Sequence, residues 1–226
     1  MDETLIHCLR DFTRAPRRCD FVAEVAAGVG PTDGLTLYHI YKRPHVDLFL
    51  KTVHQWYTVV VFTAAVKDYA NPILDQLDPS GELFDNRLFR EVILRELLRE
   101  GRPLTLSPPP RIVRRAVEYS FSSLFFSPHP LRFRPVEFCG SRVLQHCTTV
   151  AESTYKKGLE QIEPDLRDVC IVDNNDASFV TPENGIPISD YLGGAEDEAL
   201  SELIPFLDAL RFTDDVRNVL SLRLVG

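Results

Sequence analysis

Residues 59–63 read Val-Val-Val-Phe-Thr and residues 169–174 read Val-Cys-Ile-Val-Asp-Asn, so two short apolar runs each end in polar side chains. Short runs rich in β-branched residues are typical of strands that are buried on both faces of a sheet. A third short run, Ile-Pro-Ile at 186–188, follows the second. These three stretches predict the strands of a central sheet.

Apolar residues recur at helical spacing around these strands. The pattern predicts helices over residues 46–56, 66–74, 157–162 and 198–210, with Pro72 bending the second. Residues 35–42 alternate apolar and polar side chains, as a half-buried strand does. Strands that alternate with helices predict an α/β fold with a mostly parallel sheet covered by helices on both faces. Ligands of such sheets bind at the carboxyl ends of the strands, where Thr63 and Asp173 lie.

Composition limits the classes of function. The 226 residues carry a formal net charge of -8, which argues against a surface that coats nucleic acid. No apolar run reaches the roughly 18 residues that a membrane span needs. The five cysteines are an odd number without a CxxC pair, which favours a reducing compartment.

Several short motifs together carry a resemblance to a known family. They are Asp-Glu-Thr at 2–4, Lys-Arg-Pro-His-Val-Asp at 42–47, Val-Val-Phe-Thr-Ala at 60–64, Tyr-Lys-Lys at 155–157 and Val-Asp-Asn at 172–174. In this order they resemble the FCP1/small CTD phosphatases, which are protein phosphatases of the haloacid-dehalogenase type. The stretch 204–217, Ile-Pro-Phe-Leu-Asp-Ala-Leu-Arg-Phe-Thr-Asp-Asp-Val-Arg, is most similar to the Dullard-type members, the CTD nuclear envelope phosphatases.

The resemblance implies a reaction through a phospho-aspartate. The family signature is Asp-x-Asp-x-Thr, in which the first Asp attacks phosphate and the second acts as general acid and base. Asp2 matches the second Asp, Thr4 matches the Thr, and Met1 holds the position between the two aspartates. We therefore expect the attacking Asp and its strand to be missing from the chain as written. The first strand would then be truncated, and this chain would be inactive by itself.

The remaining catalytic roles follow from the same resemblance. Thr63 would donate hydrogen bonds to the phosphoryl oxygens, and Lys157 would supply a positive charge oriented by Asp173. Lys156 remains a rival for that charge. The resemblance assigns Mg²⁺ to the missing Asp, the backbone carbonyl of Asp2 and the side chain of Asn174, with Asp173 supporting the site from behind. Oxygen ligands of this kind suit Mg²⁺.

Three further matches to the family are interpreted mainly as structural. They are Arg43, Asp47 and Trp56, for which we expect a long-range ion pair and an anchor on a helix face.

Residues 92–145 differ from the rest of the chain. They contain three consecutive prolines, nine arginines, and no lysine or aspartate. We expect one domain over 1–226, interrupted by a disordered insertion at 92–145, with one possible helix at 92–99. One hypothesis is an intron retained in frame, with Met1 an internal methionine taken as a start. The alternative is an inserted surface loop, which adds little closure entropy.

The sequence thus predicts a Mg²⁺-dependent serine/threonine phosphatase module of the Dullard type. One alternative is a small phosphatase acting on the RNA polymerase II tail, and another is an inactive binding module such as a mitochondrial import receptor subunit. The expected partners are a phosphoprotein substrate and a regulatory subunit, with no direct nucleic acid. The resemblance implies a location at the nuclear envelope and endoplasmic reticulum, or in the nucleus, with membrane attachment only through an anchor upstream of Met1.

Overall fold

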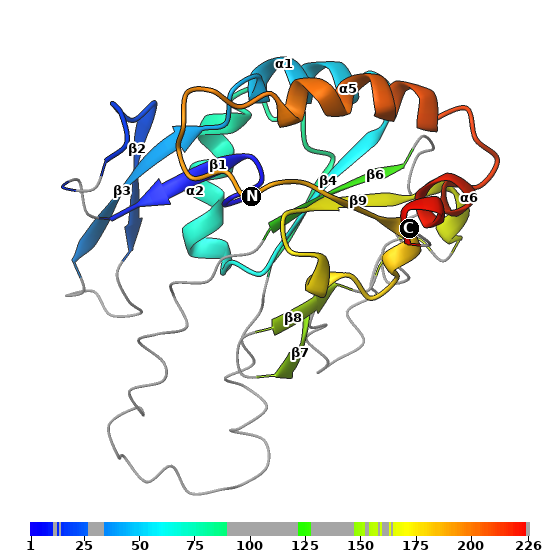
Figure 1. The fold of residues 1–226 in the computed structure, drawn as a ribbon. Coiled ribbons are helices and arrows are strands. Elements are labelled where there is room, and N and C mark those ends of the chain that lie inside the picture. Colours follow the sequence, from blue (N-terminus) through cyan, green and yellow to red (C-terminus); the bar gives the residue numbers. More distant parts are fainter. Residues whose placement is uncertain are drawn as a thin grey trace, which may run out of the picture.

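A computed structural model describes residues 1–10, 13, 15–26, 34–89, 122–127, 147–151, 154–157, 159, 163 and 165–224. Within these residues the chain forms a five-stranded sheet, a three-stranded sheet and a separate pair of strands (Figure 1). The prediction of an α/β fold is confirmed.

The five-stranded sheet has the order β10-β9-β6-β4-β5. Its strands are β4 (Thr58–Thr63), β5 (Asn86–Leu88), β6 (Ser122–Ser127), β9 (Cys170–Asp173) and β10 (Gly185–Pro187). β4 pairs in parallel with β5, and β9 pairs in parallel with β10, so both halves of the sheet have the predicted parallel arrangement. β6 lies in the centre and is antiparallel to both β4 and β9.

The residues of β4 face two separate apolar layers because side chains alternate along a strand. Val59 and Val61 belong to the main core cluster, whereas Val60 and Phe62 belong to a smaller cluster on the other face. All four are fully buried. This two-sided burial is why the sequence of β4 is a continuous apolar run rather than an alternating one.

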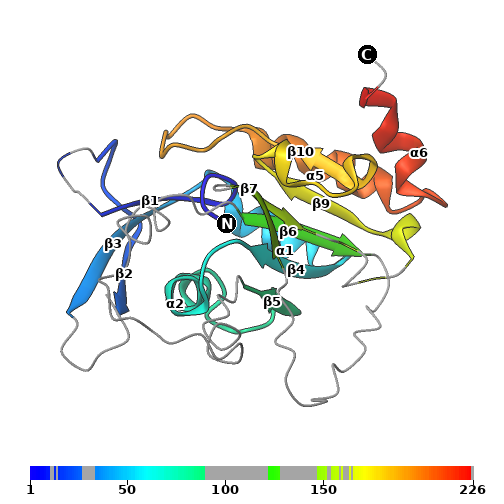
Figure 2. The same ribbon diagram turned by 90° about the horizontal axis from the view of Figure 1, so that it is seen from below.

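Two helices, α1 (Val46–Val53) and α5 (Ala199–Leu210), lie side by side over one face of the large sheet (Figure 1). The hydroxyl of Tyr57, just after α1, donates to the carbonyl oxygen of Leu207 in α5 at 2.6 Å. Helix α2 (Lys67–Leu77) stands between the two sheets and contacts β2, and it continues through Pro72 (Figure 2). The short helix α6 (Val216–Leu220) follows α5.

The three-stranded sheet is antiparallel and precedes α1 in the chain. Its order is β1-β3-β2, with β1 (Ile6–Leu9), β2 (Phe21–Ala26) and β3 (Leu35–Lys42). The bounds of β3 are those predicted from its alternating pattern. Ala23 and Val25 of β2 join the same core cluster as Val61, so one core connects both sheets.

The expected disorder of 92–145 is wrong for residues 122–127, which form β6. Leu124 and Phe126 are buried in the core, and the Phe126 ring meets the rings of Phe49 and Tyr57 edge to face. β6 forms because β4 and β9 offer unpaired backbone groups on both sides, which a buried strand must satisfy. The rest of 92–145, including the helix predicted at 92–99, lies outside the described residues.

The helix predicted at 157–162 is wrong at its first residue. Lys157 ends strand β8 (Thr154–Lys157), which pairs with β7 (Cys147–Ala151). Cross-strand pairing has outweighed the apolar spacing that suggested a helix, a common result for short segments. Of the remaining positions only Leu159 is described, as part of a 3₁₀ turn.

The long-range ion pair predicted for Arg43 is confirmed, and its partner is Asp197. The Arg43 guanidinium is fully buried and forms two hydrogen bonds to the Asp197 carboxylate, at 2.7 and 2.9 Å. Asp47 pairs instead with Lys42 at 2.7 Å. Trp56 is partly buried at the core, with the Arg211 guanidinium 5.0 Å from its ring centre.

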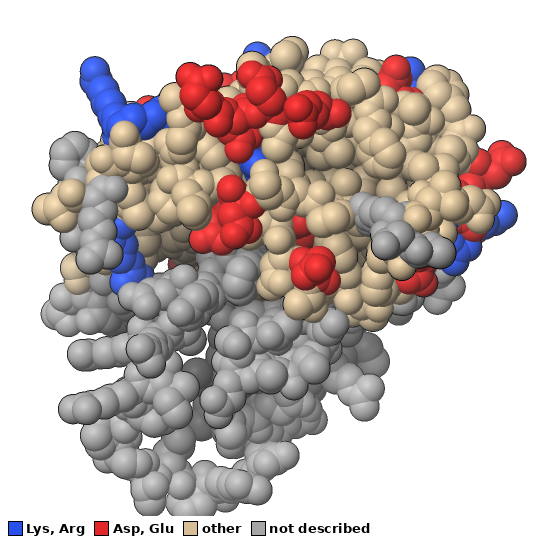
Figure 3. All heavy atoms as spheres, viewed as in Figure 1, with Lys and Arg blue, Asp and Glu red and all other residues tan. Residues whose placement is uncertain are grey.

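Acidic side chains predominate on the face shown in Figure 3, in line with the net charge of -8. No helix in the described part of the chain has the length and hydropathy needed to cross a bilayer.

Candidate active site

The carboxyl edge of the large sheet carries two of the predicted site residues. Thr63 ends β4, Asp173 ends β9, and both are fully buried. Val61 and Val172 are both opposite Leu124 of β6, so Thr63 and Asn174, each two residues further on, lie at the same level of the sheet. Their backbones are two strand spacings apart, about 10 Å.

The first residues of the chain form a tight turn at this edge. The carbonyl oxygen of Met1 accepts hydrogen bonds from the backbone N–H groups of Leu5 and Ile6, at 2.8 and 3.1 Å. Glu3 has a φ of 60°, an uncommon conformation for a residue with a side chain. The carbonyl oxygen of Thr4 accepts from the buried Arg43 guanidinium at 3.1 Å. Residues 1–6 are therefore fixed both by hydrogen bonds within the turn and by the bond from Arg43.

The carboxylate of Asp2 is buried and is held by Tyr69 from α2. The Tyr69 hydroxyl donates to Asp2 Oδ1 at 3.1 Å, and the Tyr69 ring meets Tyr38 edge to face at 5.0 Å. Burial, followed by the negative charge of Asp2, raises the pKa of Tyr69 well above its ordinary value. Tyr69 therefore remains a hydrogen-bond donor to Asp2 across the physiological pH range.

Asn174 connects the N-terminal turn to the sheet. Its Oδ1 accepts from the Thr4 hydroxyl at 3.0 Å, and its Nδ2 donates to Asp190 Oδ1 at 3.0 Å and to Glu3 Oε2 at 3.3 Å. The structure thus joins Thr4, two residues after Asp2, to Asn174 from the opposite end of the sequence.

Asp173 stabilises the turn that follows β9. Its carboxylate accepts from the Asn175 N–H at 2.8 Å and from the Ser178 hydroxyl at 2.9 Å. Asn175 Oδ1 in turn accepts from the Ala177 N–H at 3.2 Å and caps the 3₁₀ turn η4 (Asp176–Ser178). These bonds fix the turn that follows Asn174 at the edge of the sheet.

Thr63 and Lys157 are the other two residues for which catalytic roles were predicted. The Thr63 Oγ1 accepts from the Ala65 N–H at 2.9 Å, which fixes the side chain at the start of the loop after β4. The backbone of β8, which ends at Lys157, runs beside η4. The side chain of Lys157 lies outside what the structure describes, so its pairing with Asp173 stays a prediction.

Sequence reasoning missed Tyr69, Glu3 and Asp190. Asp190 follows β10, the parallel neighbour of β9, and the rule that ligand-binding groups follow parallel strands could have identified it. Tyr69 carried no such signal, because it faces Asp2 from the interior of a helix. Glu3 was noted only as the residue between Asp2 and Thr4.

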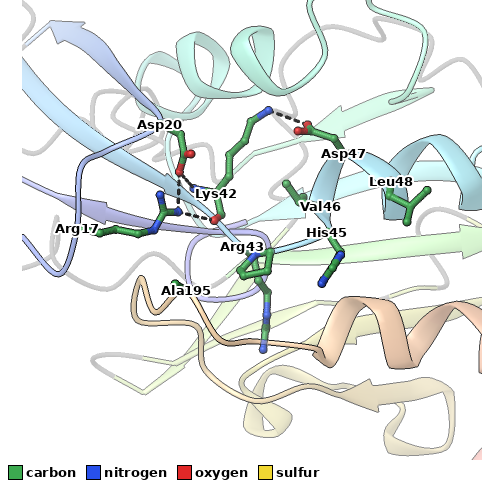
Figure 4. Close-up of a pocket in the computed structure, with 10 residues that line it drawn as sticks. Arg17, Asp20, Lys42, Arg43, His45, Val46, Asp47, Leu48 and Ala195 are labelled. Carbon is green, nitrogen blue, oxygen red and sulfur yellow. Dashed lines mark hydrogen bonds and ion pairs between the residues drawn. The ribbon is translucent and has the colours of Figure 1, made fainter.

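A pocket of about 330 Å³ lies elsewhere, at the start of α1 (Figure 4). Its charged groups are already paired, Arg17 with Asp20 and Lys42 with Asp47, each at 2.7 Å. Ala195, from the loop before α5, completes the lining. The pocket shares none of the predicted catalytic residues.

Known proteins are similar in sequence to this chain over nearly its whole length. The pattern of the family described as NLI interacting factor-like phosphatase matches residues 1–101 and 134–217. The unmatched residues 102–133 include β6 and are fewer than the predicted insertion of 92–145.

Curated relatives agree with this match. The CTD nuclear envelope phosphatase 1 homolog of Caenorhabditis elegans is 32% identical over 227 residues, which cover 98% of this chain and 68% of that protein. The CTD nuclear envelope phosphatase 1 of Xenopus laevis is 32% identical over 230 residues, covering 99% and 70%. Nuclear envelope morphology protein 1 of Saccharomyces cerevisiae is 30% identical over 227 residues, covering 99% and 40%.

The solved structures that match include two of Fcp1, an RNA polymerase II CTD phosphatase. One is 17% identical with a TM-score of 0.49, and covers 100% of this chain and 52% of that chain. The other, the fission yeast protein bound to beryllium fluoride, is 18% identical with a TM-score of 0.47 and covers 99% and 52%. On the strength of the sequence matches, this chain belongs to the NLI interacting factor-like phosphatase family.

Proposed function

We propose that this chain is the catalytic module of a Mg²⁺-dependent phosphoserine/phosphothreonine phosphatase, in which Asp2 is the general acid and base. The observation that carries the proposal is the hydrogen bond between Thr4 and Asn174 at the carboxyl edge of the sheet, two residues from the buried Asp2. The module is one domain that spans both sheets and their common core.

The donor set fits Mg²⁺ in type. Asn174 Oδ1 and the backbone carbonyl of Asp2 are hard oxygen ligands, which this ion prefers, and water commonly completes its coordination. In the described part of the chain, no three His, Cys, Asp or Glu side chains form a group that could hold a metal. The site therefore depends on these two oxygens together with the family's attacking Asp. When bound, Mg²⁺ would neutralise negative charge on the phosphate and the carboxylates.

The chemistry needs two carboxylates. The attacking carboxylate forms a bond to phosphorus while the bond from phosphorus to the serine oxygen breaks, and Asp2 gives its proton to that oxygen. Asp2 then takes a proton from water, whose oxygen attacks phosphorus and releases the carboxylate. Thr63 donates to the phosphoryl oxygens, and Lys157 offsets their charge, oriented by Asp173.

The attacking carboxylate belongs two residues before Asp2, directly ahead of Met1. Residues 1–226 supply the acid and base and the groups that bind phosphate. We propose the nuclear envelope, with the endoplasmic reticulum continuous with it, as the location of this chain, because its relatives are named after the nuclear envelope. A phosphoprotein substrate, a regulatory subunit and an anchor upstream of Met1 complete the proposal.

The proposal is tested with a chain extended at its N-terminus by a segment that ends in Asp directly before Met1. A matched control has Asn in place of that Asp. We expect the Asp version to release phosphate from phosphoserine peptides only when Mg²⁺ is present, and the Asn version to release none above background. Equal rates in the two versions would contradict the proposal and favour the reading as a binding module.

The substrate class is tested with the same extended chain. Peptides from the RNA polymerase II tail are compared with phosphoserine peptides of unrelated sequence. A preference for the tail peptides would favour the small CTD phosphatases instead.

A further inference from the structure

The side-chain amide of Asn174 lies between one hydroxyl and two carboxylates. Thr4 Oγ1 is 3.0 Å from Asn174 Oδ1, whereas Asp190 Oδ1 and Glu3 Oε2 are 3.0 and 3.3 Å from Asn174 Nδ2. Asn174 is partly buried and Asp190 is exposed. The family pattern includes Asn174 but assigns no role to Asp190.

The chemistry of these neighbours fixes the orientation of the amide. Ionised carboxylates only accept hydrogen bonds, so the amide nitrogen, which has two N–H groups, must face Asp190 and Glu3. The amide oxygen must then face the hydroxyl of Thr4, which can donate to it. If the amide were rotated by half a turn, its oxygen would meet two carboxylates, which repel it.

The two carboxylates are themselves held in place. The backbone N–H of Tyr191, next to Asp190, donates to the carbonyl oxygen of Glu3 at 2.8 Å. The Tyr191 hydroxyl donates to the carbonyl oxygen of Lys42 at 2.9 Å. These bonds hold the loop after β10 against the N-terminal turn. The backbone of Asp190 therefore has a fixed position relative to Asn174.

The local charge is negative. Burial, then the charges of Asp190 and Asp2, raise the pKa of Glu3 above its ordinary value, and the hydrogen bond from Asn174 partly offsets them. The contact between Asn174 and Asp190 is both shorter and more open to solvent than the contact with Glu3. Asp190 is thus the side chain that can be changed with least effect on the buried turn.

We propose that Asp190 is a positioning residue that holds the Asn174 amide with its Oδ1 presented, beside Thr4, as an oxygen ligand for Mg²⁺. The inference deepens the proposed function and, for its metal part, rests on it. Hydrogen-bond partners that orient a metal ligand in this way typically contribute about 10- to 100-fold in metal affinity.

The test uses the chain extended at its N-terminus, which carries Asp directly before Met1, and three variants of it. Asp190→Ala removes the acceptor, and Asp190→Asn keeps an acceptor oxygen without the charge. Asp176→Ala is the control, since it removes an equal charge two residues from Asn174, and the Asp176 side chain has no hydrogen bond or ion pair with the other described residues. The Asn174 side-chain NH₂ signals are followed by NMR, first without metal and then during a Mg²⁺ titration.

We expect Asp190→Ala to shift the Asn174 NH₂ signals, to speed their exchange with water and to weaken Mg²⁺ binding about 10-fold or more. Asp190→Asn should retain most of the native signal positions and lose less affinity. Asp176→Ala should leave the signals in place. It should weaken Mg²⁺ binding only through the loss of one distant negative charge, and added salt should reduce that effect. If Asp190→Ala matches Asp176→Ala in both readouts, the inference is overturned.

The two proposals fail in different ways. If the extended chain without further substitutions binds no Mg²⁺, the metal part of the proposed function fails. The metal-free spectra still decide the role of Asp190: shifted Asn174 signals in Asp190→Ala support it, and unchanged signals refute it.

Discussion

Replacing Phe126 by Ala tests whether β6 is a true part of the core. The Phe126 side chain is fully buried, and its ring lies 6.1 Å from that of Phe49 and 5.6 Å from that of Tyr57, at 89° and 69°. Truncation of a buried Phe to Ala costs about 3–5 kcal/mol, and each edge-to-face pair contributes about 0.5–1.5 kcal/mol beyond burial. With two such pairs, we expect a loss near the upper end, about 4–5 kcal/mol.

The assay is urea unfolding of the full chain, followed by circular dichroism. A matched control is Phe212→Ala, because Phe212 is 74% exposed and its truncation should change stability by less than about 1 kcal/mol. Phe126→Leu keeps most of the buried volume and should fall between the two, which keeps the test informative if the Ala variant does not fold. A loss below about 1 kcal/mol for Phe126→Ala would refute the placement of β6 in the centre of the sheet.

Three further predictions concern groups that hold the fold around the site. Arg43→Ala should destabilise the chain by about 3–5 kcal/mol, because it leaves the partly buried Asp197 carboxylate without its partner. Burial opposes ionisation of Asp78, but hydrogen bonds from three backbone N–H groups prevail and lower the pKa of Asp78. Its stabilising effect should be complete near neutral pH and lost as pH falls below about 4, and Asp78→Asn should remove that dependence. Gly185→Ala should destabilise by about 1–3 kcal/mol, because a Cβ there would overlap the Phe179 ring.

Chemical unfolding measures all three, with a separate control for each. Arg167→Ala breaks an exposed ion pair and should leave stability unchanged. Asp75→Asn removes an exposed carboxylate from α2. It should not alter the loss of stability at low pH that is attributed to Asp78. Gly194→Ala adds a methyl group where no atom lies within 4 Å. An Arg43, Asp78 or Gly185 variant that behaves like its control would contradict the corresponding prediction.

The parts of the fold that the sequence predicts are those set by local pattern. β4 and β9 are continuous apolar runs because both faces of the sheet are covered, and β3 alternates because one face is less buried. β6 could not be predicted in this way. Its Ser/Phe-rich sequence becomes a strand through pairing with β4 and β9, which lie far from it in the chain.

The candidate site shows the same division. Asp2, Thr4 and Asn174 were identified from the motif order, and the structure joins Thr4 to Asn174 through a hydrogen bond while Asp2 accepts one from Tyr69. Asp190 was missed because its role depends on how the loop after β10 folds back onto the N-terminal turn. A contact of this kind is set by tertiary structure and leaves no periodic signal in the sequence.

The role of Asp2 as general acid and base is the central claim. It is tested by Asp2→Asn in the extended chain, whose added N-terminal segment places Asp directly before Met1. The rate of phospho-enzyme formation is measured with a serine phosphate, a poor leaving group, and with p-nitrophenyl phosphate, which leaves without protonation. We predict that Asp2→Asn slows the serine phosphate by about 10²- to 10⁴-fold and p-nitrophenyl phosphate far less, with labelled phospho-enzyme then accumulating. Equal slowing of both substrates, with no accumulated phospho-enzyme, would contradict the account.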